Sequence, residues 1–385
     1  MIELTKGQKE AMDLLKKWWK NKDKQIFEIA GYAGTGKSSL IYSLMDEIGL
    51  TRENVKFATY TGKASLVLNR KGVPATTVHR LIYTPEEVIK IDPETKKIIS
   101  RKVKFIKKEK IDSNIQLLVL DECSMIDKDM LSDIKSFGVP IIVLGDRGQL
   151  PPIHGEIILL KNPDVILTEI MRQNEGDPIV HLSFLAREGK RINKGRYGPK
   201  ALVCCKSEIT DNILLKANII IVGKNKTRQS INDYIRYDLL ERKKELPEVN
   251  DKIICRKNDW SIEIEGTPLI NGIIGYCKNP ITDIDYGNRT FQLDFRPEFC
   301  KLDYFENLNC TLDTFIPPDI NDKDHYIDYS KQKFEFAYAI TTHLSQGSQY
   351  NSLVLFEERL GDKEFHRKWL YTGITRAEKL IVIGQ

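Results

Sequence analysis

The chain lacks the features that mark secreted, metal-binding and membrane-spanning proteins. Its seven cysteines are an odd number, Cys204 and Cys205 are adjacent, and no C-x-x-C pair occurs. This pattern argues against a disulfide framework or a structural zinc site and predicts reduced thiols in a cytosolic protein. No uncharged run reaches the length of a transmembrane span, and the N-terminus has no apolar secretory segment. Internal repeats and low-complexity tracts are also missing.

What remains is the composition of a globular protein. The chain has 385 residues, of which 41% are hydrophobic and 29% charged. This length is enough for two or more domains with their own cores. The net charge of +5 is mildly basic, so nucleic acid is permitted as a partner but not required.

The most specific motif is G-x-x-x-x-G-K-[ST], with Gly31, Gly36, Lys37 and Ser38 in register. An apolar strand is expected over residues 25–30 before it, and an amphipathic helix is expected after it. In this setting glycines let backbone N–H groups face phosphates at a helix N-terminus. Lys37 would neutralise the β- and γ-phosphates of a nucleoside triphosphate, and the Ser38 hydroxyl would bind Mg²⁺. The alternative is an ordinary glycine-rich turn.

Two further apolar strands end in polar residues. The run from Ile115 to Asp121 ends in the pair Asp121-Glu122, and a later strand ends in Gly145-Asp146 with Gln149 close behind. Carboxyl ends of buried parallel strands are where α/β sheets present catalytic groups. We therefore expect neighbouring strands around one nucleotide, with Asp121 holding magnesium and Glu122 polarising the attacking water. The alternatives are an acidic pair that starts a loop and a plain turn.

The order of the motifs resembles superfamily 1 helicases, in particular the RecD/Dda-like branch, superfamily 1B. A compact chain of this kind is also compatible with a phage-type helicase. In sequence order, the segments that carry the resemblance are LTKGQKEA (Leu4 to Ala11), GYAGTGKSS from Gly31, TYTGKASLVL (Thr59 to Leu68), ATTVHRLI (Ala75 to Ile82), VLDECSMID, GDRGQLPPI, TEIMRQN (Thr168 to Asn174), AITTHLSQGSQYNSLVLF (Ala339 to Phe356) and LYTGITRAEKLIVIG (Leu370 to Gly384).

The resemblance implies an α/β fold of two RecA-like P-loop domains, each with an insert. The first domain would span residues 1–170, with a β-hairpin pin at 84–110. The second would span 171–249 and 330–385, with an SH3-like β-barrel at 250–329. Repeated short strand-like segments and the turn signals Asn271-Gly272 and Gly287-Asn288 support the barrel.

The resemblance also assigns the ATP site. Gln8 would read adenine, Gln149 would sense the γ-phosphate, and Arg172 and Arg376 would act as arginine fingers, although each arginine could instead form a surface salt bridge. The expected ATP-binding residues are Gln8, Gly34, Thr35, Gly36, Lys37, Ser38 and Ser39, the expected magnesium ligands are Ser38 and Asp121, and the expected catalytic residues are Lys37, Glu122, Gln149, Arg172 and Arg376.

Single-stranded nucleic acid would cross both domains in the family. Hydroxyl and amide groups suit phosphate contacts, and histidine rings stack on bases without reading their identity. The alternatives are that Thr77 and Thr342 are helix caps and that His79 is a packed core histidine. The expected contacts are Thr61, Lys63, Thr77, His79, Thr342, His343, Ser345 and Gln346.

The expected hairpin insert is strongly basic. Eight lysines or arginines occur between Lys96 and Lys110, and the turn signal includes Pro93, Glu94 and Thr95. Family pins often present an apolar or aromatic tip, which this turn lacks, so strand separation is less firmly predicted than translocation. The alternative is a solvated lysine-rich loop.

Together these observations predict an ATP- and magnesium-dependent helicase that moves 5′→3′ along single-stranded DNA. The polarity follows from the resemblance alone. Single-stranded DNA and single-strand/duplex junctions are the expected partners, in replication, recombination or repair, with a monomer as the active form. The expected location is the cytoplasm, of the host if the chain is phage-encoded. The alternatives are a translocase without robust unwinding, an RNA-directed motor, and a nucleotide-switched binding module.

Overall fold

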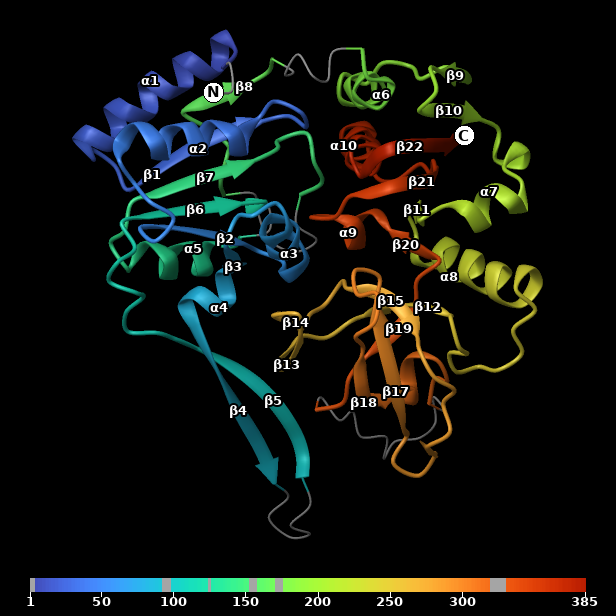
Figure 1. Cartoon of the computed structure of the whole chain (residues 1–385). Coiled ribbons are helices and arrows are strands. Elements are labelled where there is room, and N and C mark those ends of the chain that lie inside the picture. Colours follow the sequence, from blue (N-terminus) through green and yellow to red (C-terminus); the bar gives the residue numbers. More distant parts are fainter. Residues whose placement is uncertain (1–3, 92–97, 124–125, 152–157, 170–175, 319–329) are drawn as a thin grey trace. The chain divides into compact units, whose positions relative to one another are not determined.

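The computed structural model describes residues 4–91, 98–123, 126–151, 158–169, 176–318 and 330–385, and Figure 1 shows its helices and strands. The chain has a mixed α/β fold that divides into two compact units. Unit 1 comprises residues 1–83, 107–209 and 345–385, and unit 2 comprises residues 84–106 and 210–344. Each unit is described by itself.

Unit 1 contains a six-stranded sheet in the order β3-β2-β6-β7-β1-β8. All neighbouring strands are parallel. The central strands are continuous buried apolar runs, as expected for a sheet covered on both faces. The strands are β1 (Ile26–Gly31), β2 (Val55–Thr59), β3 (Ala75–Thr77), β6 (Leu117–Asp121), β7 (Ile141–Gly145) and β8 (Val165–Leu167).

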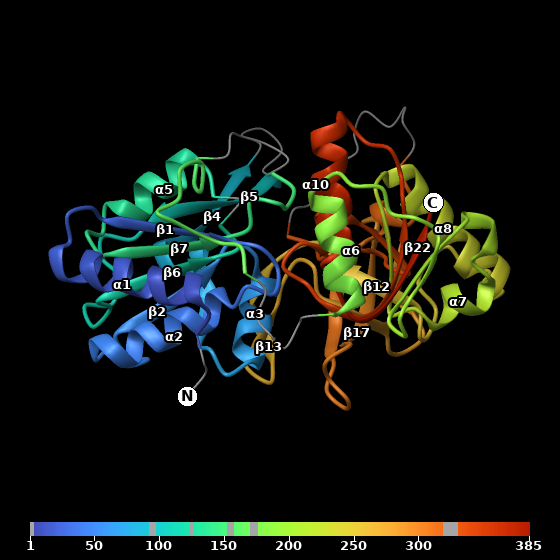
Figure 2. The same ribbon diagram turned by 90° about the horizontal axis from the view of Figure 1, so that it is seen from above.

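Helices cover both faces of this sheet, with α1 and α2 on one face and α5 on the other (Figure 2). One buried core lies under α1, α2 and α3, and a second core lies under α4 and α5. A capping box starts α1, because Thr5 and Gln8 bind each other's backbone N–H groups. The helices are α1 (Lys6–Asn21), α2 (Lys37–Ile48), α3 (Gly62–Arg70), α4 (Val78–Ile82) and α5 (Lys128–Lys135).

The rest of unit 1 is built from residues 178–208 and from the end of the chain, residues 345–385. Strands β21, β22 and β10 pair in parallel, and β9 joins β10 antiparallel. These elements place the C-terminal residues in the same unit as the P-loop. Their bounds are α6 (Pro178–Arg187), β9 (Gly195–Tyr197), β10 (Ala201–Cys204), η3 (Lys206–Glu208), β21 (Tyr350–Phe356), α10 (Lys363–Ile374) and β22 (Ala377–Gly384).

Unit 2 combines a small α/β part with an antiparallel sheet. The α/β part contains the parallel pair β11 and β20, with the helical segments α7, α8 and η4. The bounds are α7 (Asp211–Lys216), β11 (Ile219–Val222), α8 (Asn225–Asp233), η4 (Tyr234–Leu239), β20 (Ala339–Thr341) and α9 (Thr342–Ser345), whose last residue belongs to unit 1.

The antiparallel sheet has the order β16-β17-β15-β12-β19, and β18 also pairs with β17. Phenylalanine side chains fill its core, with Phe295 and Phe334 rings 4.8 Å apart. The bounds are β12 (Lys252–Cys255), β15 (Ile274–Cys277), β16 (Ile284–Asp285), β17 (Thr290–Pro297), β18 (Phe305–Thr311), η5 (Leu312–Thr314) and β19 (Phe334–Phe336).

Two strand pairs complete unit 2. β13 (Asp259–Ile264) and β14 (Thr267–Leu269) form one antiparallel pair. β4 (Tyr83–Ile91) and β5 (Ile98–Lys107) form the other. Basic and apolar side chains of the second pair are exposed, among them Lys104, Val88 and Phe105.

A fully buried ion pair joins η4, which contains Arg236, to Asp251 just before β12 of the antiparallel sheet. Arg236 Nε lies 3.0 Å from Asp251 Oδ2, and neither side chain reaches solvent. The Tyr338 hydroxyl donates to the other carboxylate oxygen at 2.7 Å. Removing either partner of such a pair would destabilise the fold, because it would leave a buried charge without compensation.

The local expectations of the sequence are confirmed where the structure describes them. The strand expected before the P-loop is β1, the helix after it is α2, and the two strands that end in polar residues are β6 and β7. All seven cysteines are free thiols. No helix of the described residues has the length and apolar character needed to cross a membrane. The expected turn at Pro93, Glu94 and Thr95, and the residue Arg172, lie outside the described residues.

Candidate active site

The P-loop joins β1 to α2 and has the backbone shape of a phosphate cradle. Gly34 and Gly36 have φ values of 81° and 73°, in the left-handed region that glycine adopts without strain. A Cβ on Gly31 would lie 2.7 Å from Thr35 Oγ1, so a larger residue there would displace the Thr35 side chain. α2 then starts at Lys37 without a side-chain cap. Its first backbone N–H groups are left for an anion, as in other phosphate-binding helix N-termini.

Lys37 lies over this loop. Its Nζ donates to Gly31 O at 2.7 Å and to Tyr32 O at 3.3 Å. Ser38 and Ser39 follow in the first turn of α2 and are partly exposed. A lysine at the cradle and a hydroxyl in the next position are the side chains that a nucleoside triphosphate with magnesium requires.

Gln8 is buried against the P-loop. Its side chain is 1% exposed, and its Nε2 donates to Thr35 O at 3.0 Å. Its Oε1 accepts from Thr5 N at 3.0 Å, which closes the capping box of α1. In this structure Gln8 therefore connects the start of α1 to the phosphate cradle.

A small polar cavity lies beside Gln8. It has a volume of about 220 Å³ and is bounded by residues from the start of α1 and from the end of β8. The Gly7 N–H donates to Glu169 Oε2 at 3.1 Å across it. Its position next to the P-loop makes this cavity the candidate pocket for a nucleotide base.

Asp121 is the last residue of β6 and Glu122 follows it. β6 lies beside β7, and β7 lies beside β1. Asp121 Oδ1 accepts from Glu122 N at 2.9 Å. Glu122 has a φ of 53°, a left-handed conformation that non-glycine residues adopt mainly at turns and functional sites. Burial raises the pKa of both carboxyl groups, and the positive charge of Lys37 opposes the increase at Asp121. The neighbouring strands expected around one nucleotide are thus present.

The segment after β7 is held by several contacts. Gln149 is 8% exposed, and its N–H donates to Asp146 O at 3.2 Å. The Asp146 carboxylate accepts from Gly148 N at 2.8 Å and from the Tyr371 hydroxyl at 2.6 Å. The Thr372 hydroxyl accepts from Leu150 N at 2.9 Å. α10 is therefore bound directly to the loop that carries Gln149.

Arg376 follows α10 and is 5% exposed. Its guanidinium donates to Thr372 O at 3.1 Å and to Ser348 O at 3.2 Å. Its positive charge lowers the pKa of Glu122 against the larger effect of burial. The structure therefore brings Arg376 into electrostatic reach of Glu122, although the two are far apart in the sequence. A surface salt bridge, the alternative for this arginine, is not what the structure contains.

Several buried oxygens near these residues lack a partner. Gln149 Oε1, Gln346 Oε1 and Ser348 Oγ have no hydrogen bond within the described residues. Buried polar groups are normally paired, so such atoms indicate a network that a ligand or a second arrangement of the site completes. Together with the open P-loop, the lysine and the carboxylate pair, they fit a nucleoside triphosphate with magnesium.

The expected nucleic-acid contacts in unit 1 also have structural roles. Thr61 and Thr77 are the N-caps of α3 and α4, accepting from Ala64 N and Arg80 N. Thr77 is buried, whereas Thr61 is partly exposed. Lys63 Nζ donates to the Tyr350 hydroxyl at 3.0 Å. For Thr77 the helix-cap alternative is therefore confirmed as a structural role.

His79 packs between two aromatic rings, 5.7 Å from the Tyr60 ring and 5.8 Å from the Tyr83 ring. Burial lowers its pKa, which favours a neutral ring at physiological pH. The same cause lowers the pKa of His343. Neutral rings suit base stacking better than phosphate binding.

The residues from 342 to 346 cross the boundary between the units. Thr342 is fully buried in unit 2, and its hydroxyl donates to Val222 O at 3.2 Å. Ser345 is fully buried in unit 1. Gln346 Nε2 donates to Leu150 O at 3.2 Å. Gln346 therefore binds the same loop as α10 does.

Two residues of this site, Tyr350 and Tyr371, were not named from the sequence, and Asp146 was named as a strand end without a role. Asp146, Tyr350 and Tyr371 make the contacts just described, and all three lie inside the quoted motif segments. Asp146 lies close to Gln149 in the sequence and Tyr371 lies close to Arg376, and this was the available signal for these two residues. Only the structure shows that Tyr371 reaches Asp146.

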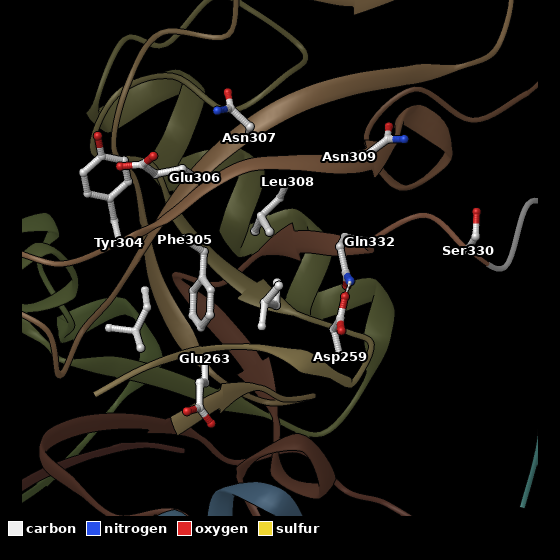
Figure 3. A pocket seen from close by; sticks show the side chains of 12 residues that line it. Asp259, Glu263, Tyr304, Phe305, Glu306, Asn307, Leu308, Asn309, Ser330 and Gln332 are labelled. Carbon is white, nitrogen blue, oxygen red and sulfur yellow. Dashed lines mark hydrogen bonds between the residues drawn. The ribbon is translucent and has the colours of Figure 1, made fainter. Parts of the chain in front are cut away.

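A larger cavity lies in unit 2, between β13 and β18 (Figure 3). It has a volume of about 410 Å³. Figure 3 shows Gln332 and Asp259 pointing toward one another, joined by a hydrogen bond of 2.7 Å. Asp259, Glu263 and Glu306 give the cavity three carboxylates. This charge disfavours a phosphate ligand, so the candidate nucleotide site is the one in unit 1.

The fold and this site define a P-loop nucleoside-triphosphatase. Glu122, one of its two paired carboxylates, lies within electrostatic reach of Arg376 near the end of the chain. Residues 3–205 match the family described as an AAA domain, and residues 336–383 match the UvrD-like helicase C-terminal domain. The first match covers more than half of the chain, so the chain belongs to that family. An AAA domain followed by a UvrD-like helicase C-terminal domain is an arrangement similar to that of the RecD-type relatives of this chain.

Relatives of this chain are distant in sequence. A protein of Methanocaldococcus jannaschii is 25% identical over 92% of this chain and 36% of its own length. The ATP-dependent RecD2 DNA helicase of Deinococcus radiodurans is 24% identical over 92% of this chain and 46% of its own length. The chain thus spans less than half of either relative.

A solved structure of two coordinating Pif1 helicases, on DNA unwinding at forked double-stranded DNA, shares the fold. The superposition covers 100% of this chain and 92% of the Pif1 chain, with a TM-score of 0.59 and 18% sequence identity. At this identity the likeness establishes the fold.

Proposed function

We propose that this chain is an ATP- and magnesium-dependent helicase that moves 5′→3′ along single-stranded DNA and unwinds duplex. The observation that carries the proposal is the convergence of Lys37, Glu122 and Arg376 in unit 1. Phosphoryl transfer needs positive charge around the transferring group and a positioned nucleophile, and these residues supply both. The match to a UvrD-like helicase C-terminal domain and the similarity to the RecD2 DNA helicase support DNA as the track.

Each residue has a proposed role at the ATP. Lys37 and the N–H groups of the P-loop bind the phosphates, and Gln8 holds the loop beside the base pocket. Glu122 orients the attacking water, and Arg376 stabilises the charge that develops on the γ-phosphoryl group. Ser38 and Asp121 would hold magnesium, which would neutralise part of the phosphate charge. Arg172 is proposed as a second arginine finger.

The domain organisation follows the family. Residues 1–170 form the first RecA-like domain, and 84–110 form its pin. Residues 171–249 and 330–385 form the second RecA-like domain, and 250–329 form an SH3-like barrel. The antiparallel β12, β15, β17 and β19 support the barrel, and the pair β4 and β5 supports the pin.

Single-stranded DNA is proposed to bind along the motif segments described above. Thr61 and Lys63 offer donors for phosphates, and Lys63 Nζ also donates to the hydroxyl of Tyr350 at the start of β21. The neutral rings of His79 and His343 offer stacking surfaces that do not read sequence. Thr77, Thr342, Ser345 and Gln346 complete the proposed contacts. A motor needs this indifference to sequence.

The decisive test is strand displacement on one labelled duplex that carries either a 5′ or a 3′ single-stranded tail. With ATP and magnesium, we expect unwinding of the 5′-tailed duplex only. Lys37→Ala serves as the inactive control. Unwinding from the 3′ tail would contradict the proposed polarity. Stimulation of ATP hydrolysis by single-stranded RNA and not by DNA would identify an RNA-directed motor.

The proposed pin has its own test. Val88, Phe105 and Ile106 are exposed apolar side chains on β4 and β5, 46%, 43% and 39% exposed. Stacking of a base on an aromatic ring contributes about 1–3 kcal/mol, so we expect Phe105→Ala to slow strand displacement roughly tenfold. DNA-stimulated ATP hydrolysis should stay within about twofold of the unsubstituted protein.

A matched control is Leu14→Ala, which removes a similarly exposed apolar side chain from α1. It should leave strand displacement unchanged. If Phe105→Ala behaves like this control, the strand pair acts as a solvated basic segment and not as a wedge.

A further inference from the structure

Tyr371 occupies a central place in unit 1 that the proposed roles above do not use. It lies in α10 and is 1% exposed. Its hydroxyl accepts from the P-loop N–H of Ala33 at 2.9 Å and donates to Asp146 Oδ2 at 2.6 Å. One oxygen atom therefore joins the phosphate cradle, the loop that carries Gln149, and the helix that precedes Arg376.

The ring of Tyr371 has little freedom. A Cβ on Gly148 would lie 2.9 Å from Tyr371 Cε1, so the ring fits because residue 148 is glycine. The Tyr32 ring packs against it edge-to-face, with centroids 6.5 Å apart. Burial and the Asp146 carboxylate raise the pKa of the Tyr371 phenol, which keeps the hydroxyl proton available for donation. The hydroxyl is thus held in a fixed position.

Contacts of the next residues extend this connection to Arg376. Thr372 accepts from Leu150 N through its hydroxyl and from Arg376 Nε through its backbone carbonyl. The last turn of α10 is therefore tied to the P-loop by Tyr371, to the loop after β7 by both residues, and to Arg376 by Thr372. A displacement of α10 relative to the P-loop would displace Arg376 as well.

We infer that Tyr371 is a positioning residue for ATP hydrolysis. Its hydroxyl sets the position of α10, and hence of Arg376, relative to the P-loop and to Glu122. This inference rests on the proposed function. A group that places an arginine finger affects the transition state more than the bound ground state, so turnover should depend on the hydroxyl more than nucleotide affinity does.

The test is Tyr371→Phe, which keeps the ring and removes both hydrogen bonds. Steady-state ATP hydrolysis with saturating single-stranded DNA should show kcat reduced roughly 10- to 100-fold, the range for misplacement of a catalytic group by about 1 Å. The KM for ATP and the Kd of a fluorescent ADP should change less than about twofold. Tyr42→Phe is the matched control, because the Tyr42 hydroxyl is buried in α2 without a hydrogen-bond partner in the described structure. It should leave kcat unchanged.

A double variant separates positioning from a general structural effect. If Tyr371 acts through Arg376, Tyr371→Phe/Arg376→Ala should turn over ATP no more slowly than Arg376→Ala alone. Independent, multiplying losses in the double variant would overturn the inference. So would wild-type kcat for Tyr371→Phe, or weaker ADP binding with kcat intact. An unsubstituted protein without ATP hydrolysis would instead refute the proposed function itself.

Discussion

Replacing Arg376 by alanine should lower ATP turnover about 10³–10⁵-fold while nucleotide binding persists. The guanidinium is buried, bound to two backbone carbonyls, and close enough to lower the pKa of Glu122. A fixed positive charge in such a site costs no reorganisation when charge develops on the γ-phosphoryl oxygens. The measurement is single-turnover ATP hydrolysis together with equilibrium binding of fluorescent ADP.

Two further variants sharpen this prediction. Arg359→Ala removes an exposed arginine from the same part of the chain and should leave turnover unchanged. Arg376→Lys keeps the charge but loses the planar fork of donors, so it should recover only part of the activity. Lost nucleotide binding with normal turnover per bound ATP would show that Arg376 holds the nucleotide and is not an arginine finger.

Lys37→Ala should abolish ATP hydrolysis and strand displacement. The Nζ group lies at the P-loop carbonyls of Gly31 and Tyr32, beside the N-terminus of α2 where the phosphates would bind. Removal of one preorganised donor in an active site costs about 10²–10³-fold, and here a full positive charge is lost as well. A coupled assay for ADP release measures the effect.

The matched control is Lys20→Ala, an exposed lysine in the last turn of α1. It should hydrolyse ATP like the unsubstituted protein. Because Lys37 also binds the loop that carries it, the thermal midpoint of Lys37→Ala should be compared with that of this control. If Lys37→Ala hydrolysed ATP at a near wild-type rate, the predicted ATP site at the P-loop would be wrong.

The parts of the site that were predictable from the sequence are those with local physical causes. The strand, loop and helix around Gly31 follow from an apolar run, glycines that permit left-handed φ, and the lysine that begins α2. The carboxylate pair after β6 could be placed at a sheet edge because a continuous apolar run indicates a buried parallel strand. The neighbouring positions of β6 and β7 were expected and found.

The contacts of single polar side chains were harder to foresee. Gln8 was assigned to adenine from the family, yet its amide closes a helix cap and binds the P-loop backbone in this structure. Thr77 lies in a motif that predicts a nucleic-acid contact, and in the structure it is the N-cap of α4. A hydroxyl or amide can make both kinds of contact, so the cap contacts are found and the ligand contacts of Gln8 and Thr77 stay predictions.

By itself, the sequence determined that this protein has a P-loop, a carboxylate pair and an ordered set of helicase-type motifs, because each depends on residues within one short segment. The tertiary structure decided which distant segments meet. Tyr371 contacts Ala33, 338 residues away, and Asp146, 225 residues away. Arg376 lies within electrostatic reach of Glu122. Hydrophobic periodicity encodes which face of a strand or helix is buried, but not which polar side chains meet when those elements pack.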